Sequence, residues 1–230
     1  VSPTRGPSSA LSAARCAMVR AVNVPGTVDH QAEGRVSIGD PAGGVTPLAR
    51  RVFELVRPAW EVTLSERIVR DLWHKLLWNV GFNAMCAVTG ATSGQTLAVP
   101  ESAALVRQAM DELVAVANAR GVDLTAAEAA RMAAFNLQLR DYRPSTAQDI
   151  AAGKPVERDA ICGFVTREGA ALGIPVPVNR VLDGLLALQE ARATGAIAAA
   201  LDRLTREAAG ERANVFRAVV DPAGPGWSEG

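Results

Sequence analysis

Residues 72–83, with the sequence LWHKLLWNVGFN, place one lysine and two carboxamides at intervals of four residues within an otherwise apolar stretch. Side chains four residues apart on an α-helix differ by about 40° around its axis, so Lys75, Asn79 and Asn83 form one slowly winding stripe. An ammonium group and two amides flanked by apolar side chains need hydrogen-bond partners. The spacing therefore predicts a paired polar cluster, or a pocket in which a ligand supplies the missing partner.

The alternative for Lys75 is an ordinary surface role, because helical lysines usually extend the charged end of the side chain into solvent. Asparagine, however, is unfavourable inside helices, since its side chain competes for backbone hydrogen bonds. Two asparagines on one stripe favour a hydrogen-bonding function. The spacing by itself leaves both interpretations open.

Composition narrows the classes of function. The chain has 230 residues, is 49% hydrophobic and carries a formal charge of zero, so it can bury a substantial core. Partners such as nucleic acid or an anionic membrane usually require a basic excess. No apolar run reaches the roughly 20 residues of a membrane span, and residues 1–15 do not resemble a signal peptide. We therefore expect a soluble, cytoplasmic protein that binds neither nucleic acid nor membrane.

Cysteine and histidine are too sparse to suggest a metal centre. Cys16, Cys86 and Cys162 are widely spaced, which favours reduced thiols over a disulfide framework. His30 and His74 are isolated, and the sequence has no Cys-x-x-Cys motif. We expect no metal site, and acid–base chemistry then depends on lysine and carboxylates.

The chain changes character near residue 60. In its first part, β-like segments at 18–22 and 34–39 alternate with Pro- and Gly-containing turns, and Thr46-Pro47 predicts a helix to about residue 57. Residues 61–64 suit another strand. Residues 1–20 show no clear period. Helical periodicity follows, with helices predicted at 65–89, 101–120, 126–141, 146–153, 157–172, 178–194 and 196–209. The expected organisation is a partial domain at 1–64, a helical domain at 65–210 and a disordered tail at 211–230.

A second polar cluster occupies residues 145–159. Ser145 and Gln148 fit a capping box, and Glu157 would lie in the first turn of the helix predicted at 157–172, where the helix dipole favours a carboxylate. Structural roles at helix termini are therefore the alternatives to a functional role for Ser145 and Glu157.

Together the two clusters resemble the ketopantoate reductases, or 2-dehydropantoate 2-reductases, over about residues 21–188. The shared pieces are, in order, Leu-Trp-x-Lys-Leu-x-x-Asn-x-x-x-Asn, Thr-Gly, Ser-x-x-Gln-Asp-x-x-x-Gly-Lys-x-x-Glu-x-Asp, Gly and Gly-Ile-Pro-x-Pro-x-Asn. The resemblance implies a mainly α fold. Its main part is a helical C-terminal domain like that of 6-phosphogluconate dehydrogenase, preceded by a partial α/β Rossmann-type remnant that lacks its first βαβ unit.

The resemblance also implies an activity and a set of site residues. The family reduces a 2-keto acid with NADPH, and the expected reaction is reduction of 2-dehydropantoate to pantoate in pantothenate biosynthesis. Lys75 matches the catalytic lysine that donates a proton to the keto oxygen, and Glu157 matches the acidic residue that completes the site. Asn79, Asn83 and Ser145 match substrate-binding residues. We further expect Glu157 to face Lys75 across a cleft.

Many members of the family dimerise through the helical domain, which implies a homodimer here. The helices predicted near 101–120 and 178–200 are rich in Ala, Leu and Val, more than one small domain obviously needs. We expect this apolar surface to be shared with a second copy.

The chain departs from the family pattern in several places. It has no Gly-x-Gly-x-x-Gly turn between a strand and a helix, the element that holds a dinucleotide pyrophosphate, so its cofactor-binding residues are unknown and weak NADPH binding is expected. A catalytically silent helical dimerisation or ligand-binding module is therefore the alternative function. Val156, Arg158 and Cys162 replace the family's usual Thr, aliphatic residue and Asn, and Ser93 stands where some members have Asn.

Overall fold

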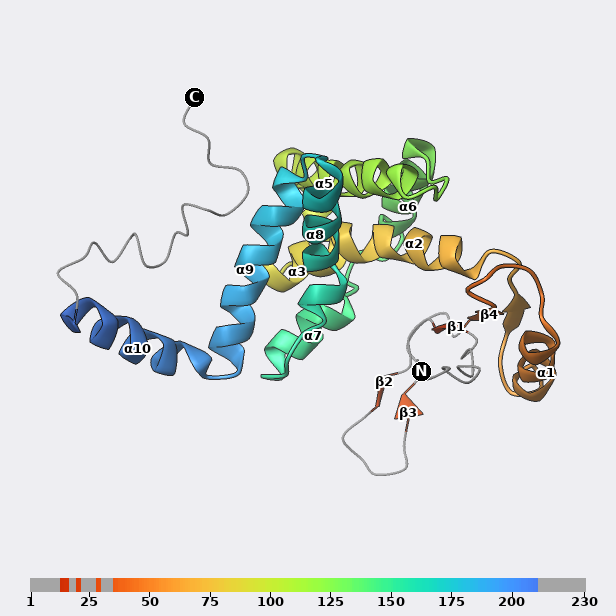
Figure 1. Cartoon of the computed structure of the whole chain (residues 1–230), viewed down its shortest axis with the longest axis horizontal. Coiled ribbons are helices and arrows are strands. Elements are labelled where there is room, and N and C mark those ends of the chain that lie inside the picture. Colours follow the sequence, from red (N-terminus) through yellow and green to blue (C-terminus); the bar gives the residue numbers. More distant parts are fainter. Residues whose placement is uncertain (1–12, 17–19, 22–27, 30–34, 211–230) are drawn as a thin grey trace, which may run out of the picture. The chain divides into compact units, whose positions relative to one another are not determined.

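The computed structural model describes residues 13–16, 20–21, 28–29 and 35–210 (Figure 1). The chain divides into two compact units, residues 1–75 and 76–230. Helices predominate among the described residues, as predicted, and none of these helices is long and apolar enough to cross a membrane. The division falls within a helix, and the domain boundary expected near residue 65 stays a prediction. The expected tail at 211–230 lies outside the described residues.

The first unit contains a β-α-β element made of β4 (Val36–Gly39), α1 (Pro47–Val56) and β5 (Val62–Leu64). Strands β4 and β5 pair in parallel, which confirms the strands and the helix expected in this region. Buried Val36, Ile38 and Ala49 form a small core, flanked by apolar residues of α1 and β5 (Val52, Phe53, Val56, Val62 and Leu64). This partial α/β element agrees with the expected fold class.

The turn before α1 has the predicted chemistry. The hydroxyl oxygen of Thr46 accepts a hydrogen bond from the N–H of Ala49 at 3.2 Å, and Pro47 occupies the first turn, where no intrahelical donor is needed.

Three further strands precede β4. β1 (Ala13–Cys16) pairs antiparallel with β4, so the sheet order is β1-β4-β5, while β2 (Arg20–Ala21) and β3 (Val28–Asp29) pair separately. Strand β1 was not expected, because its sequence AARC has no alternation of apolar and polar residues and its position depends on pairing with β4.

The helix predicted at 65–89 consists of three consecutive segments. These are α2 (Ile68–Trp78), a π-helical turn η1 (Asn79–Asn83) and α3 (Ala84–Thr89). Within η1, the N–H of Ala84 donates to the carbonyl of Asn79, five residues earlier. Gly90 has a φ of 73° and ends α3 in the left-handed conformation that favours glycine.

The described part of the second unit contains helices joined by turns and loops, without strands. Its further elements are α4 (Ser93–Ala98), α5 (Pro100–Ala119), α6 (Ala126–Asn136), α7 (Ser145–Ala151), the 3-10 turn η2 (Arg158–Ala160), α8 (Cys162–Leu172), α9 (Pro177–Ala193) and α10 (Ala196–Gly210). Helix α5 packs against η1, α6, α8 and α9. Its buried Val106, Met110, Leu113 and Val116 recur at helical spacing and form the centre of this unit.

One additional helix and two helix boundaries differ from the prediction. Helix α4 was not expected, although Thr92 and Gln95 form a complete capping box at its start. Helix α6 ends at Asn136 instead of continuing to residue 141, and a series of turns follows. Helix α8 begins at Cys162 instead of residue 157, because Ile161 has a non-helical backbone conformation with φ −108° and ψ −106°.

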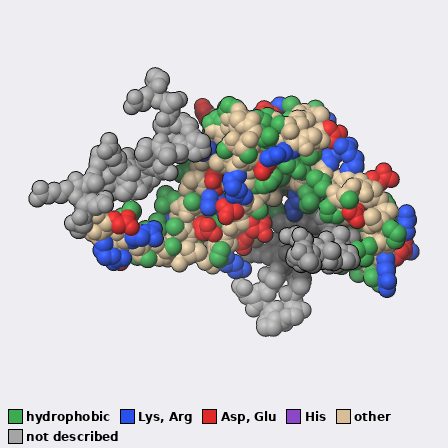
Figure 2. All heavy atoms as spheres, viewed as in Figure 1, with side chains coloured by type: hydrophobic (Ala, Val, Ile, Leu, Met, Phe, Trp, Pro, Cys, Tyr) green, Lys and Arg blue, Asp and Glu red, His purple; other side chains and the backbone are tan. Residues whose placement is uncertain are grey.

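The surface of the molecule carries charges of both signs. On the face shown in Figure 2, acidic and basic side chains of the described residues are interspersed, in agreement with the formal charge of zero.

Candidate functional site

The π-helical turn η1 contains two of the predicted site residues, Asn79 and Asn83. A turn closed by an i→i+5 hydrogen bond holds more residues than an α-helical turn, so each residue advances by less than 100° around the axis. In an α-helix, Asn83 would lie about 40° ahead of Asn79 around the helix axis. In the π-helical turn Asn83 lies behind Asn79 instead. Single π turns inside α-helices are frequent at functional sites. Lys75 lies one helical turn earlier in the chain, in α2, and is partly buried.

Asn83 connects η1 to the start of α7. Its side chain is 5% exposed, and its Nδ2 donates a hydrogen bond to Oγ1 of Thr146 at 3.3 Å. Thr146 is the neighbour of Ser145, so the fold brings together two predicted site positions that are more than 60 residues apart. The Oδ1 atom of Asn83 is buried and has no hydrogen-bond partner among the described residues. Thr146 was missed by sequence reasoning, since only its position beside Ser145 pointed to it.

Ser145 does not form the predicted capping box. The N-cap of α7 is Pro144, and Ser145 is an exposed residue in the first turn. The side chain of Gln148 does not reach back to Ser145 but donates to the carbonyl oxygen of Arg143 at 2.7 Å. The alternative role of Ser145 as a helix cap is therefore wrong, because Pro144 occupies the N-cap position of α7.

An aromatic cluster fixes the surroundings of η1. The ring of Trp78, which precedes η1, lies 5.5 Å from Phe82, 6.4 Å from Phe135 of α6 and 6.0 Å from Tyr142, measured between ring centroids. Tyr142 belongs to the loop that leads into α7. Tilted and edge-on aromatic pairs at these distances are favourable. The cluster therefore stabilises the position of η1 relative to the loop that leads into α7.

Helix α5 also packs against η1. A Cβ atom at Gly81 would lie 2.5 Å from Cε of Met110 and 3.3 Å from Cγ1 of Val106. Glycine at this position allows the π turn to lie directly on α5. The turn is therefore packed against both α5 and the aromatic cluster, which favours a fixed position for Asn83.

Glu157 lies outside the contact between Asn83 and α7. It is exposed, it precedes η2, and it makes no side-chain hydrogen bond to the end of that short helix. Since α8 begins five residues later, Glu157 is not in its first turn, and the dipole alternative in its predicted form is wrong. No hydrogen bond joins Glu157 to the described Asn79, Asn83 or Ser145. Its expected approach to Lys75 stays a prediction.

Comparison with known proteins identifies the family. Residues 67–190 match the family model described as ketopantoate reductase PanE/ApbA C terminal. The chain belongs to the ketopantoate reductase family. The match covers α2 through most of α9, and with them every residue that sequence reasoning assigned to the site.

Named relatives agree with this assignment. A 2-dehydropantoate 2-reductase of Mesorhizobium japonicum is 30% identical over 171 residues, which are 73% of this chain and 50% of the relative. The crystal structure of a PanE/ApbA family ketopantoate reductase from Ralstonia eutropha matches with a TM-score of 0.70 at 32% identity. The match covers 79% of this chain and 59% of the Ralstonia eutropha chain. A ketopantoate reductase from Staphylococcus aureus, described as dimeric, shares the fold at 22% identity and a TM-score of 0.68, covering 78% of this chain and 62% of its own. The chain spans about half the length of the curated relatives it matches.

One piece of the ketopantoate reductase pattern has a structural role. Asn179 ends the motif Gly-Ile-Pro-x-Pro-x-Asn and is fully buried near the start of α9. Its backbone N–H donates to Oε2 of Glu112 at 2.9 Å, its Nδ2 donates to the same oxygen at 2.8 Å, and the N–H of Val178 donates to Oε1 at 2.9 Å. The buried Glu112 of α5 thus caps the N-terminus of α9. Sequence reasoning missed Glu112, because the two helices are far apart in the chain.

The buried thiols are poor candidates for chemistry. Burial raises the pKa of the Cys86 thiol to about 11, although nearby Ser93 and Arg143 lower it. Burial, followed by the charges of Asp183 and Glu112, raises the pKa of the Cys162 thiol well above its usual range. Both side chains stay protonated at neutral pH and are inert. The described residues also contain no group of three or more His, Cys, Asp or Glu side chains that could hold a metal.

Proposed function

We propose that this chain carries the substrate-binding part of an NADPH-dependent 2-keto acid reductase that converts 2-dehydropantoate to pantoate for pantothenate biosynthesis. The observation that carries the proposal is the buried Asn83 of η1, whose side chain reaches Thr146 at the start of α7, in a chain whose residues 67–190 match the family. An unsatisfied buried polar atom such as its Oδ1 costs about 1–3 kcal/mol. A water molecule that accompanies the bound substrate is a donor that would satisfy it.

The proposed roles follow the family motif. Lys75 donates a proton to the keto oxygen as charge develops there, and a positioned ammonium suits both the electrostatic and the acid role. Asn79, Asn83 and Ser145 bind the polar groups of the substrate. Glu157 completes the site by accepting a hydrogen bond from the substrate hydroxyl.

The NADPH requirement rests on family membership. A pyrophosphate binds to backbone N–H groups that are free at the start of a helix. In the glycine-containing loop after β4, the N–H of Ala42 donates to Oδ1 of Asp40, that of Gly43 to the carbonyl of Asp40, and that of Gly44 to the carbonyl of Glu66, each at 2.8–2.9 Å. These three backbone N–H groups already donate hydrogen bonds within the chain. The described loop therefore does not fit a dinucleotide, and no step through the cofactor follows from it.

Binding of the keto acid tests the proposal without turnover. We expect titration of the ¹⁵N-labelled chain with 2-dehydropantoate to shift the amide signals of residues 79–83 and 145–146 in a saturable way. Asn83→Leu keeps a similar shape but removes the amide, so it should weaken binding about 10-fold, as expected for the loss of about 1.4 kcal/mol.

Thr146→Val is the matched control, because it removes the hydroxyl partner and leaves the Asn83 amide in place. Its binding should fall by only about 2-fold to 3-fold, since this loss is well below 1 kcal/mol. Wild-type affinity in Asn83→Leu would show that Asn83 is a structural residue.

The exposed surface of α9 favours dimerisation. Dimerisation is also part of the alternative function, a helical dimerisation or ligand-binding module. This helix buries Leu182 and Leu186 and exposes Val181, Leu185 and Leu188, which are 61%, 40% and 50% accessible. Spacings of four and three residues place the exposed group on one stripe. An unpaired apolar stripe on a helix favours association, so we propose a homodimer formed through this α9 stripe.

Charge placed on the α9 stripe should abolish the dimer. We expect the double variant Val181→Asp, Leu185→Asp to have half the mass of the wild type in light scattering at high protein concentration, because desolvating two carboxylates opposes association. Leu55→Asp is the control, since Leu55 of α1 is 73% exposed but lies outside the stripe. A monomeric wild type would exclude the proposed dimer.

A further inference from the structure

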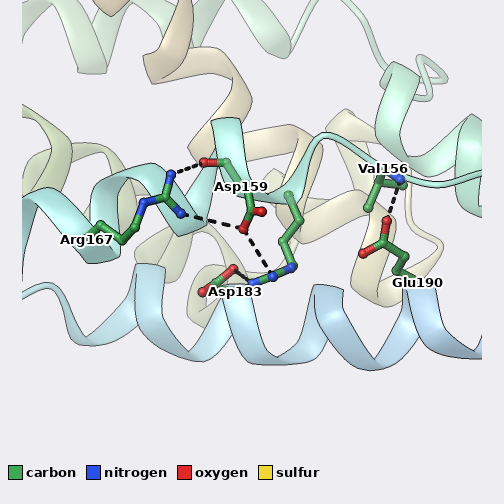
Figure 3. A network of polar contacts seen from close by, with 6 residues as sticks. Val156, Asp159, Arg167, Asp183 and Glu190 are labelled. Carbon is green, nitrogen blue, oxygen red and sulfur yellow. Dashed lines mark hydrogen bonds and ion pairs between the residues drawn. The ribbon is translucent and has the colours of Figure 1, made fainter. Parts of the chain in front are cut away.

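The residues on either side of Glu157 are both anchored to α9. Figure 3 shows Val156 with Glu190, and Asp159 and Asp183 in the neighbouring polar network. The N–H of Val156 donates to Oε1 of Glu190 at 2.9 Å, and Nη1 of Arg158 donates to Oδ1 of Asp183 at 2.6 Å. Asp183 and Glu190 are seven residues apart, nearly two helical turns, so they project from the same face of α9. Glu157, whose own side chain makes no capping bond, is the middle residue of a tripeptide held at both ends.

Arg158 is the centre of a charge network in this region. Besides Asp183, its Nη2 atom lies 3.1 Å from Oδ1 of Asp159. Burial lowers the pKa of Arg158, but the hydrogen bond and charge of Asp183, then the charges of Asp159 and Glu190, raise the pKa above its ordinary value. The pair with Asp183 is partly shielded from solvent, with side-chain exposures of 28% and 18%. Such a pair is less screened by water and salt than an exposed one.

The start of α8 restrains the segment from its C-terminal side. A Cβ atom at Gly163 would lie 3.2 Å from the carbonyl oxygen of Arg158 and 3.2 Å from Oδ1 of Asp159, so η2 is packed closely against the first turn of α8. Nη2 of Arg167 also donates to the carbonyl oxygen of Asp159 at 2.8 Å. Contacts with α9 and with α8 therefore restrict the backbone around Glu157.

We infer that Arg158 and Glu190 are positioning residues that fix the backbone at Glu157. The consequence for substrate binding rests on the proposed function, whereas the fixed backbone does not. An exposed glutamate has many side-chain conformations, and a rigid backbone limits how many of them must be lost when a ligand binds. Arg158, which stands where the family favours an aliphatic residue, thus has a specific task in this chain.

The inference is tested by ¹⁵N relaxation of the labelled 230-residue chain. We expect the Glu157 amide to have an order parameter near 0.85 in the wild type, typical of rigid backbone, and below about 0.6 in the double variant Arg158→Leu, Glu190→Ala. Arg120→Leu, which breaks the pair between Arg120 and Glu168, should leave the Glu157 order parameter unchanged.

Two conservative variants separate positioning from general stability. Glu190→Gln keeps a carbonyl oxygen that accepts the Val156 N–H, and the charge reversal Arg158→Asp, Asp183→Arg restores an ion pair of opposite polarity. Both should keep the Glu157 amide rigid. If the double variant does not fold, the comparison of Glu190→Ala with Glu190→Gln gives the same test.

Binding of 2-dehydropantoate distinguishes this inference from the proposed function. Arg158→Leu, Glu190→Ala should weaken binding about as much as Glu157→Gln does, roughly 10-fold for exchanging a charge-assisted hydrogen bond for a neutral one. Wild-type binding by Glu157→Gln would refute the proposed role of Glu157, while the order parameters would still decide the positioning. A rigid Glu157 amide in the double variant would overturn the inference.

Discussion

In a complete protein that reduces 2-dehydropantoate, replacing Lys75 by alanine is expected to lower kcat by about 100-fold or more, the scale typical of losing a general acid. The keto oxygen acquires negative charge as it is reduced, and Lys75 is proposed to supply both the neighbouring positive charge and the proton. The measurement is the rate of NADPH oxidation with 2-dehydropantoate and NADPH both saturating, so that weak cofactor binding does not limit the rate. Equal turnover of the variant and the wild type would refute the assignment.

Lys75→Arg separates the two contributions. Arginine keeps the positive charge but does not release a proton at neutral pH, so we expect kcat to stay low in this variant. Recovery of turnover would mean that Lys75 acts only through its charge. The composition makes this comparison informative, because only two of the 24 Lys and Arg residues are lysines. Arginine is the usual cation of this chain, and a lysine at position 75 suits a group that must give up its proton.

Local patterns predicted the helices well where periodicity and caps agree. The β4-α1-β5 element followed from β-like runs and the Thr46-Pro47 start, and α5 and α9 followed from apolar periodicity. The same reasoning failed for Ser145, since a Ser-x-x-Gln signature is local while Pro144 occupies the N-cap. Complete capping boxes occur instead at Thr92 and Thr125. A short signature therefore indicates a helix start without fixing which residue caps it.

The features that shape the site depend on distant parts of the chain. The π turn is not encoded in the apolar pattern of residues 72–83, because its close packing requires Met110 of α5 opposite Gly81. The contact between Asn83 and Thr146 joins residues 63 positions apart. Family motifs marked residues 72–83 and 145–159 as functional. Only the fold shows that the buried amide of Asn83 reaches the first turn of α7. The contacts that hold the neighbours of Glu157 on α9 also join residues far apart in the chain, so the sequence did not predict them.

Glu112→Ala is expected to have the largest effect on stability, lowering the free energy of unfolding by about 3 kcal/mol or more. The carboxylate of Glu112 accepts hydrogen bonds from the N–H groups of Val178 and Asn179 and from the Asn179 side chain. Hydrogen bonds to a charged group contribute about 1.5–3 kcal/mol each, and removing the acceptor leaves buried donors unsatisfied. Urea unfolding followed by far-ultraviolet circular dichroism measures the change.

Gln108→Ala is the matched control, because Gln108 is an exposed residue of the same helix one turn earlier and its loss should change the unfolding free energy by less than about 0.5 kcal/mol. Glu112→Gln should lie between the two, since one carbonyl oxygen still accepts a hydrogen bond while the charge is lost. If Glu112→Ala unfolds at the same urea concentration as Gln108→Ala, the cap does not hold α9. Helix α5 supports the π turn through Met110 and α9 through Glu112, and α9 in turn anchors the segment that contains Glu157. Loosening α9 at its start should therefore also raise the mobility of the Glu157 amide, which a cap of purely local importance would leave unchanged.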